Sequence, residues 1–171
     1  RITHSTRALV DRAVTLGYGA LAVTLHDRYF DPAPHAAYAR ERGLVLLPGI
    51  ERTIGRSHVL LINFPAACND VRSFDDIARL KRQFGGLVVA PHPFYPIPSA
   101  LGRSLDRHVA LFDAVEVNAM YTRLVDFNRR AITVYERAGF ESTGELAPVG
   151  VGRSGFKLLL VAPVDRLLGD G

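Results

Sequence analysis

Two histidines and a glutamate lie where their side chains could share a metal ion. His26, Glu51 and His92 each come just after a short apolar stretch, whereas His58 opens such a stretch rather than following one. Neutral imidazoles and a carboxylate suit a borderline divalent metal such as zinc, manganese or iron. Because the carboxyl ends of parallel strands meet at one edge of an α/β sheet, we expect these side chains to converge.

Each of these residues also has a purely structural interpretation. A histidine at a strand end can cap a backbone carbonyl, and Glu51 can pair with Arg52 or Arg56. Residues Glu116 and Asn118, at the end of a further apolar stretch, are weaker candidates for the same edge. The hypothesis of a metal site therefore rests on all of these side chains lying close together, and not on any one residue.

The elements that must position these residues alternate between strand-like and helix-like periods. The apolar stretches predict strands at 19–25, 44–47, 59–62, 87–90, 112–117 and 156–161. Amphipathic spacing, with glycines at the ends, predicts helices at 5–16, 34–42, 75–84 and 128–138. Four prolines between Pro91 and Gly102 predict a loop. The alternation favours the α/β class, with a mostly parallel sheet or barrel.

Composition limits the class of protein. The 171 residues, 48% of them apolar, suffice for one domain with a core. The net charge is +4, but the arginines are scattered, which argues against a nucleic-acid partner. No apolar run approaches the length of about 20 residues that a membrane helix needs. The lone Cys68 excludes an internal disulfide and fits a reducing compartment, so we expect a cytoplasmic protein. Because Met120 is the only methionine, we expect a processed or partial chain.

Five short motifs occur in one order, each beside an expected strand. They are Thr24-Leu25-His26-Asp27, Pro48-Gly49-Ile50-Glu51, Ser57-His58-Val59-Leu60, Ala90-Pro91-His92-Pro93 and Val115-Glu116-Val117-Asn118. In this order they resemble the PHP family, named for polymerase and histidinol phosphatase. The resemblance covers about residues 1–131. It implies an incomplete distorted (β/α)7 barrel of the PHP type, with residues 132–171 as a C-terminal helix and strand that complete it or are appended to it.

The resemblance also implies a function, the hydrolysis of phosphate esters at a cluster of divalent ions, manganese, zinc or iron. A bridging carboxylate and bound water carry such chemistry. By this resemblance Glu51 and His92 would be catalytic, and the metal ligands would be His4, His26, Glu51, His58 and His92. The expected substrate is a phosphorylated small molecule or a nucleotide, whose phosphate Arg28 or Arg52 could hold. The oligomeric state stays open.

The sequence departs from the family pattern at three places. The opening His-x-His is absent, Leu25 replaces an aspartate before His26, and no Asp-x-His follows residue 131. Fewer ligands weaken metal binding, so we expect an impaired centre rather than a full di-metal one. The alternative is a non-catalytic, degenerate barrel that binds a phosphorylated ligand or a protein partner.

Residues 128–140 resemble a second family locally. Their Asn-x-x-Ala, Tyr and Gly-Phe spacing is similar to a segment of GNAT-type acetyltransferases, in which Tyr135 would act as a general acid. An amphipathic helix that ends at Gly139 explains the same residues, as would a chain joined from two unrelated pieces. An acyltransferase fragment is therefore a third hypothesis.

Overall fold

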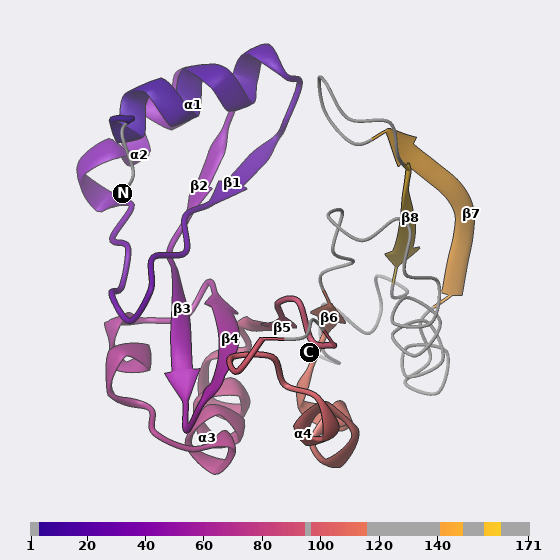
Figure 1. The fold of residues 1–171 in the computed structure, drawn as a ribbon. Coiled ribbons are helices and arrows are strands. Elements are labelled where there is room, and N and C mark those ends of the chain that lie inside the picture. The colour runs from indigo at the N-terminus through magenta and orange to yellow at the C-terminus, as the bar shows by residue number, and fades with distance from the viewer. Residues whose placement is uncertain (1–3, 95–96, 116–140, 149–155, 162–171) are drawn as a thin grey trace.

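Among the residues that the structure describes, the strands form three separate sheets. The computed structural model describes residues 4–94 and 97–115, together with the backbone of the strands β7 (Glu141–Pro148) and β8 (Phe156–Val161). Figure 1 shows the α/β arrangement of these residues. The sheets have the strand orders β1-β2, β3-β4-β5-β6 and β7-β8.

The first sheet is a parallel pair flanked by helices. It consists of β1 (Ala20–Ala22) and β2 (Val45–Leu47), and the chain between them carries a 3-10 turn, Ala33–His35, followed by α2 (Ala36–Arg40). The helix α1 (Thr6–Thr15) precedes this sheet. A small core joins the helices to the pair, with Val10, Ala13, Ala39, Leu44 and Leu46 as its buried members.

The second sheet is larger and mixed. The strands β3 (Gly49–Ile54) and β4 (Ser57–Ile62) form an antiparallel hairpin, β5 (Leu87–Ala90) pairs antiparallel with β4, and β6 (Ala114–Val115) pairs parallel with β5. The helix α3 (Phe74–Phe84) leads into β5, and α4 (Arg103–Arg107) precedes β6. Buried apolar residues of this sheet and of both helices, including Ile50, Leu61, Ile77, Val88 and Leu105, form one core.

Local sequence signals explain where α3 begins and ends. The Ser73 side chain accepts a hydrogen bond from the Asp76 amide, and the Asp76 carboxylate accepts one from the Ser73 amide. This reciprocal capping box satisfies two amide donors that the helix itself cannot pair. At the other end Gly85 adopts a left-handed conformation with φ of 68°, which ends the helix at Phe84.

Most predicted elements are present, but the sheet direction was predicted wrongly. Both neighbours of β4 run antiparallel to it, so the sheet is mixed rather than mostly parallel. The strand expected at 19–25 is shorter, and its residues are exposed or half-buried rather than buried on both faces. The strand at 156–161 is confirmed as β8, whereas its partner β7 was not predicted.

The described residues contain no closed barrel, so the (β/α)7 part of the expectation is not confirmed. The predicted helix 128–138 lies outside the described residues, as do most of the segments assigned to the C-terminal portion 132–171. That division at residue 131 therefore stays a prediction.

Candidate metal centre

His26 and Glu51 lie side by side because their segments continue one parallel ladder. Each β1 residue pairs with a β2 residue 25 positions later, and the isolated bridge from His26 to Glu51 keeps the same offset. The Glu51 amide donates to the Leu25 carbonyl at 3.0 Å, and the Glu51 carbonyl accepts from the Asp27 amide at 2.8 Å. These two hydrogen bonds hold the backbone of His26 in register with Glu51.

Gly49 lets the two segments approach each other where the ladder is interrupted. A Cβ atom at Gly49 would lie 2.8 Å from the Val23 carbonyl oxygen and 3.0 Å from the Thr24 methyl carbon. Pro48 precedes it and has no amide to donate to the ladder. The strand β2 ends at Leu47, directly before this pair, and Gly49 begins β3, so Glu51 lies inside a strand.

The β3-β4 hairpin brings His58 to the same face as Glu51. Gly55, at φ of 63°, supplies the tight turn, and the register pairs Thr53 with His58 and Glu51 with Leu60. Because side chains alternate along a strand, Glu51, Thr53 and His58 share one face of the sheet. The opposite face carries Ile50, Val59 and Leu61, which are buried in the core.

His92 reaches the same place from β5. It follows the strand by two residues and has a positive φ of 32°, an uncommon conformation for a residue with a side chain. Its Nε2 atom lies 3.8 Å from Glu51 Oε1. A histidine after the carboxyl end of a strand therefore converges with the glutamate, as the spacing predicted.

The Glu51 carboxylate is the centre of the cluster. Its Oε2 atom lies 3.5 Å from His26 Nε2, and its Oε1 atom lies 2.9 Å from His58 Nδ1. The rings of His26 and His58 are 5.0 Å apart, and those of His58 and His92 are 5.4 Å apart. Potential ligand atoms of His26, Glu51 and His58 all lie within 4.8 Å of one another, which is close enough to hold one ion.

The donor atoms fit a divalent cation. His58 Nδ1 is buried and makes no hydrogen bond with the described residues, although it lies 2.9 Å from Glu51 Oε1. Burial lowers the pKa of His58, and the nearby His26 and His92 act in the same direction against the opposing charge of Glu51. A neutral imidazole presents a free lone pair beside a carboxylate, which is the state a metal requires.

A hydrogen-bond network around Asp27 adjoins the cluster. The Asp27 carboxylate accepts hydrogen bonds from the Thr53 amide at 2.9 Å, from the Thr53 hydroxyl at 2.7 Å and from the Arg52 guanidinium. Partial burial alone would raise the pKa of Asp27, but these hydrogen bonds and the Arg52 charge outweigh it and lower the pKa. The sequence analysis assigned no role to Asp27. Its position directly after His26, just past the end of a predicted strand, could have indicated that it lies beside the cluster.

Arg52, which was expected as a possible phosphate ligand, belongs to this network. The Arg52 side chain is only 12% exposed, and it donates to Asp27 and, at 3.1 Å, to the Val71 carbonyl. Its guanidinium therefore contacts protein groups rather than open solvent. Arg28 is exposed, and its role at a phosphate stays a prediction.

The remaining candidates do not join the cluster. His4 is exposed, and the group of ligand atoms found among the described residues does not include it. Glu116, Asn118 and Tyr135 lie outside the described residues. The structure thus brings together His26, Glu51, His58 and His92, and the ligand and catalytic roles of these residues and of His4 stay predictions.

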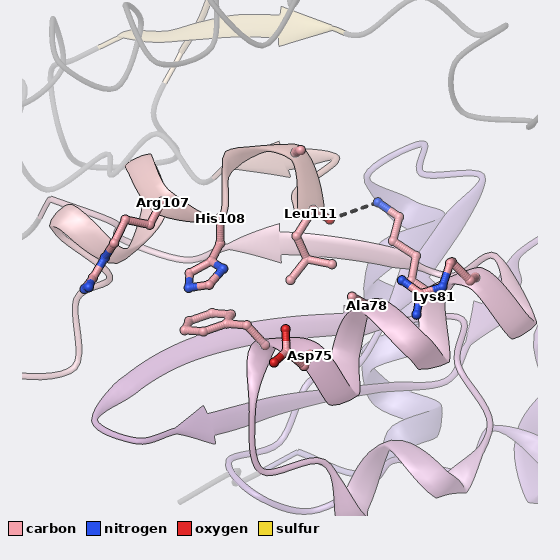
Figure 2. Close-up of a pocket in the computed structure, with 9 residues that line it drawn as sticks. Asp75, Ala78, Lys81, Arg107, His108 and Leu111 are labelled. Atoms are coloured by element: carbon pink, nitrogen blue, oxygen red, sulfur yellow. Dashed lines mark hydrogen bonds between the residues drawn. The ribbon is translucent and has the colours of Figure 1, made fainter.

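A separate groove lies between α3 and the segment that follows α4 (Figure 2). It encloses about 550 Å³, and the Phe74 and His108 rings stack at its wall with centroids 4.2 Å apart. Lys81 lines it too, but its ammonium group donates to the Leu111 carbonyl and to Asp113. No residue of the histidine cluster lines this groove. In the described part of the chain, no helix is long and apolar enough to cross a membrane.

Comparison with known proteins identifies the fold. No protein-family model and no curated protein sequence matches the chain. Among solved structures, a candidate metal-dependent phosphoesterase from Bifidobacterium adolescentis matches with a TM-score of 0.61 and 19% identity, over 80% of this chain and 79% of that one. An amidohydrolase from Chromobacterium violaceum, solved with sulfate and without metal, matches with a TM-score of 0.55 and 17% identity, over 76% and 77%.

A third match is partial. It is a two-domain protein from Bacteroides vulgatus that contains a predicted PHP-like metal-dependent phosphoesterase, with a TM-score of 0.45, 19% identity and coverage of 65% of this chain and 38% of that one. The first two matches cover most of both chains, and their low identity makes them matches of fold. The chain therefore shares the fold of the first two structures, the candidate phosphoesterase and the amidohydrolase.

Proposed function

We propose that the protein is a metal-dependent phosphoesterase that acts at the cluster around Glu51. The observation that carries this proposal is the contact of one carboxylate with three imidazoles from three separate segments, His26, His58 and His92. A single ion pair would be enough if the Glu51 carboxylate only neutralised a nearby positive charge, so three imidazole neighbours favour a metal site. The fold shared with a candidate metal-dependent phosphoesterase supports the same conclusion.

Glu51 and the three histidines would hold the metal. The two oxygens of Glu51 face different imidazoles, Oε2 toward His26 and Oε1 toward His58 and His92, so the carboxylate is placed to bridge two sets of donors. When bound, a divalent ion of manganese, zinc or iron would lower the pKa of a coordinated water and polarise a phosphoryl oxygen. Within this scheme we propose Glu51 and His92 as the catalytic residues, as the resemblance to the PHP family implies.

The substrate class that we propose is a phosphorylated small molecule or a nucleotide. The exposed His26, with 66% of its side chain accessible, leaves the cluster open to solvent on one side, as a diffusible substrate requires. Exposed Arg28, two residues later, could contact the phosphate. The location that we propose is the cytoplasm, where the lone and buried Cys68 would stay reduced.

The test combines metal content with turnover. The purified chain would be stripped of metal, reloaded with Mn²⁺, Zn²⁺ or Fe²⁺, and assayed against p-nitrophenyl phosphate, histidinol phosphate and nucleoside monophosphates. We expect Glu51→Gln and His92→Ala to lose bound metal and to lower kcat/KM at least about 100-fold, as loss of a metal-dependent nucleophile should. Glu41→Gln, at an exposed position after α2, should match the wild type. Turnover that survives in Glu51→Gln would refute the proposal.

A second function is non-catalytic binding of a phosphorylated ligand or a protein partner. It is favoured by the apolar Leu25 beside His26, which adds no donor atom to the cluster. The same experiment separates the two functions. A protein that binds metal and inorganic phosphate through Glu51, yet hydrolyses none of the esters, would have the second function rather than the first.

A further inference from the structure

His26 differs from the other imidazoles of the cluster in how it is held. Its side chain is 66% exposed, whereas the side chains of His58 and His92 are 19% and 17% exposed. Packing against neighbours fixes a buried ring, but a ring exposed to this extent depends on its backbone for its position. The backbone of His26 belongs to neither β1 nor another named strand.

Asp27 fixes that backbone to β3. Its amide donates to the Glu51 carbonyl at 2.8 Å, and its carboxylate accepts hydrogen bonds from the Thr53 amide, the Thr53 hydroxyl and Arg52. Asp27 also has a positive φ of 47°, which turns the chain away directly after His26. The main-chain and side-chain contacts of Asp27 thus connect one segment to β3 at Glu51, Arg52 and Thr53.

The residue type at this position is specific. A left-handed backbone alone would favour Gly or Asn. The network needs more than that, because both carboxylate oxygens act as acceptors, Oδ1 for Arg52 and the Thr53 amide, and Oδ2 for the Thr53 hydroxyl. Asparagine keeps the left-handed conformation but presents an NH2 group to one of these donors. Aspartate satisfies the backbone and all three donors.

From this arrangement we infer that Asp27 is a positioning residue for the metal centre, holding His26 against Glu51 through Thr53 and Arg52. The inference deepens the proposed function and rests on it for the identity of the ligand, a divalent cation. Groups that orient metal-binding residues typically change metal affinity about 10- to 100-fold when they are removed. Asp27 itself need not touch the ion to have this effect.

The test uses Asp27→Asn and Thr53→Val, with Thr53→Ser as the matched control that keeps the hydroxyl. Affinity for Mn²⁺ and Zn²⁺ would be measured by titration calorimetry on the full chain. We expect Asp27→Asn and Thr53→Val to weaken binding about tenfold or more, and Thr53→Ser to bind as the wild type. In a His26→Ala background, Asp27→Asn should cause no further loss, because the two residues act as one unit. An unchanged affinity, or an equal loss in that background, would overturn the inference.

A second readout needs no metal. In the metal-free protein, the Glu51 amide donates to the Leu25 carbonyl, and its hydrogen exchange reports on the bridge that aligns His26. We expect exchange at Glu51 to accelerate at least about tenfold in Asp27→Asn and Thr53→Val, while the Leu61 amide, in the core of β4, is unchanged. If the wild type bound no metal, the proposed function would fail, and unchanged exchange at Glu51 would separately refute the positioning role.

Discussion

His26 and Glu51 occupy equivalent positions at the end of one parallel ladder. The amide and the carbonyl of Glu51 bond to the residues on either side of His26, so the two side chains emerge next to each other. Their proximity is set by main-chain pairing rather than by the attraction of an imidazole for a carboxylate. A site built in this way is present before any ion binds, which lowers the entropic cost of binding.

Replacing Gly49 with alanine should disturb this alignment. The new Cβ would meet the Val23 carbonyl oxygen and the Thr24 methyl group at about 3 Å, and backbone cannot move aside cheaply. We expect a loss of about 1–3 kcal/mol in the free energy of unfolding, together with weaker Mn²⁺ binding. Urea denaturation and metal titration would measure the two effects.

Gly19→Ala is the matched control for that substitution. A Cβ at Gly19 meets nothing within 4 Å, and its φ is not in the positive range. Alanine there should be neutral or should stabilise the protein by up to about 1 kcal/mol, since it reduces the freedom of the unfolded chain. Equal behaviour of the two variants would show that close approach at Gly49 has no energetic weight.

The sequence allowed prediction of the site better than of the sheet around it. A strand followed by His26 and a strand followed by Glu51 implied neighbouring side chains, because parallel pairing repeats a fixed offset. The direction of β4 was not predictable in the same way. Its short apolar run is compatible with either pairing, and the two-residue turn at Gly55-Arg56, which forces an antiparallel hairpin, was not recognised as a turn signal.

The hydrogen bonds of Asp27 could not be predicted from the sequence either. They depend on the left-handed backbone conformation of Asp27, directly after His26, and on the pairing of Thr53 with His58 in the β3-β4 hairpin. Both features follow from the strand register rather than from residue type. Spacing along the chain predicts which strand ends meet. It does not predict which polar side chain of a neighbouring strand will be within hydrogen-bond distance.

His58→Leu should separate metal binding from stability. The buried Nδ1 atom lacks a hydrogen-bond partner, and a buried polar atom in that state costs about 1–3 kcal/mol. Leucine removes this cost, so we expect the metal-free variant to be as stable as the wild type or more stable, while its affinity for Mn²⁺ falls sharply. Thermal unfolding with and without the metal would check both effects.

The comparison for His58→Leu is His26→Leu. The exposed ring of His26 carries no such burial cost, so its replacement should lower metal affinity without raising the stability of the metal-free protein. A large destabilisation of the metal-free His58→Leu variant would show that the histidine serves packing, and that the cluster is structural.

Asp113 should be important for stability, because it connects α3 to the sheet. Its carboxylate accepts hydrogen bonds from the Lys81 ammonium at 2.6 Å and from the Val88 amide at 2.8 Å, and its side chain is 18% exposed. We expect Asp113→Ala to destabilise the protein by about 2–3 kcal/mol, since it removes the side-chain acceptor of the Val88 amide and one of the two acceptors of the Lys81 ammonium. Chemical denaturation would measure the change.

The Arg79–Asp76 pair offers a contrast on the outer side of the same helix. The Arg79 side chain is 69% exposed, and solvent screens an exposed pair. We therefore expect Arg79→Ala to change the free energy of unfolding by no more than about 0.5 kcal/mol. If both variants lost the same amount, burial would not be the cause of the Asp113 effect.

The α3 capping box should make stability depend on pH at the acidic end. Hydrogen bonds from the Arg72 amide and the Ser73 side chain lower the pKa of Asp76 from 3.8 to about 2. Because the folded pKa lies below the unfolded one, the carboxylate stabilises the fold fully above about pH 4, and this contribution disappears as the pH falls toward 2. Melting temperatures of the wild type and Asp76→Asn should therefore differ most above pH 4 and converge near pH 2. The control is Asp75→Asn, which removes a charge from the same helical turn but leaves these hydrogen bonds in place. If its melting temperature differed from that of the wild type as much as that of Asp76→Asn, and with the same pH dependence, the effect would come from the helix dipole rather than from the capping box.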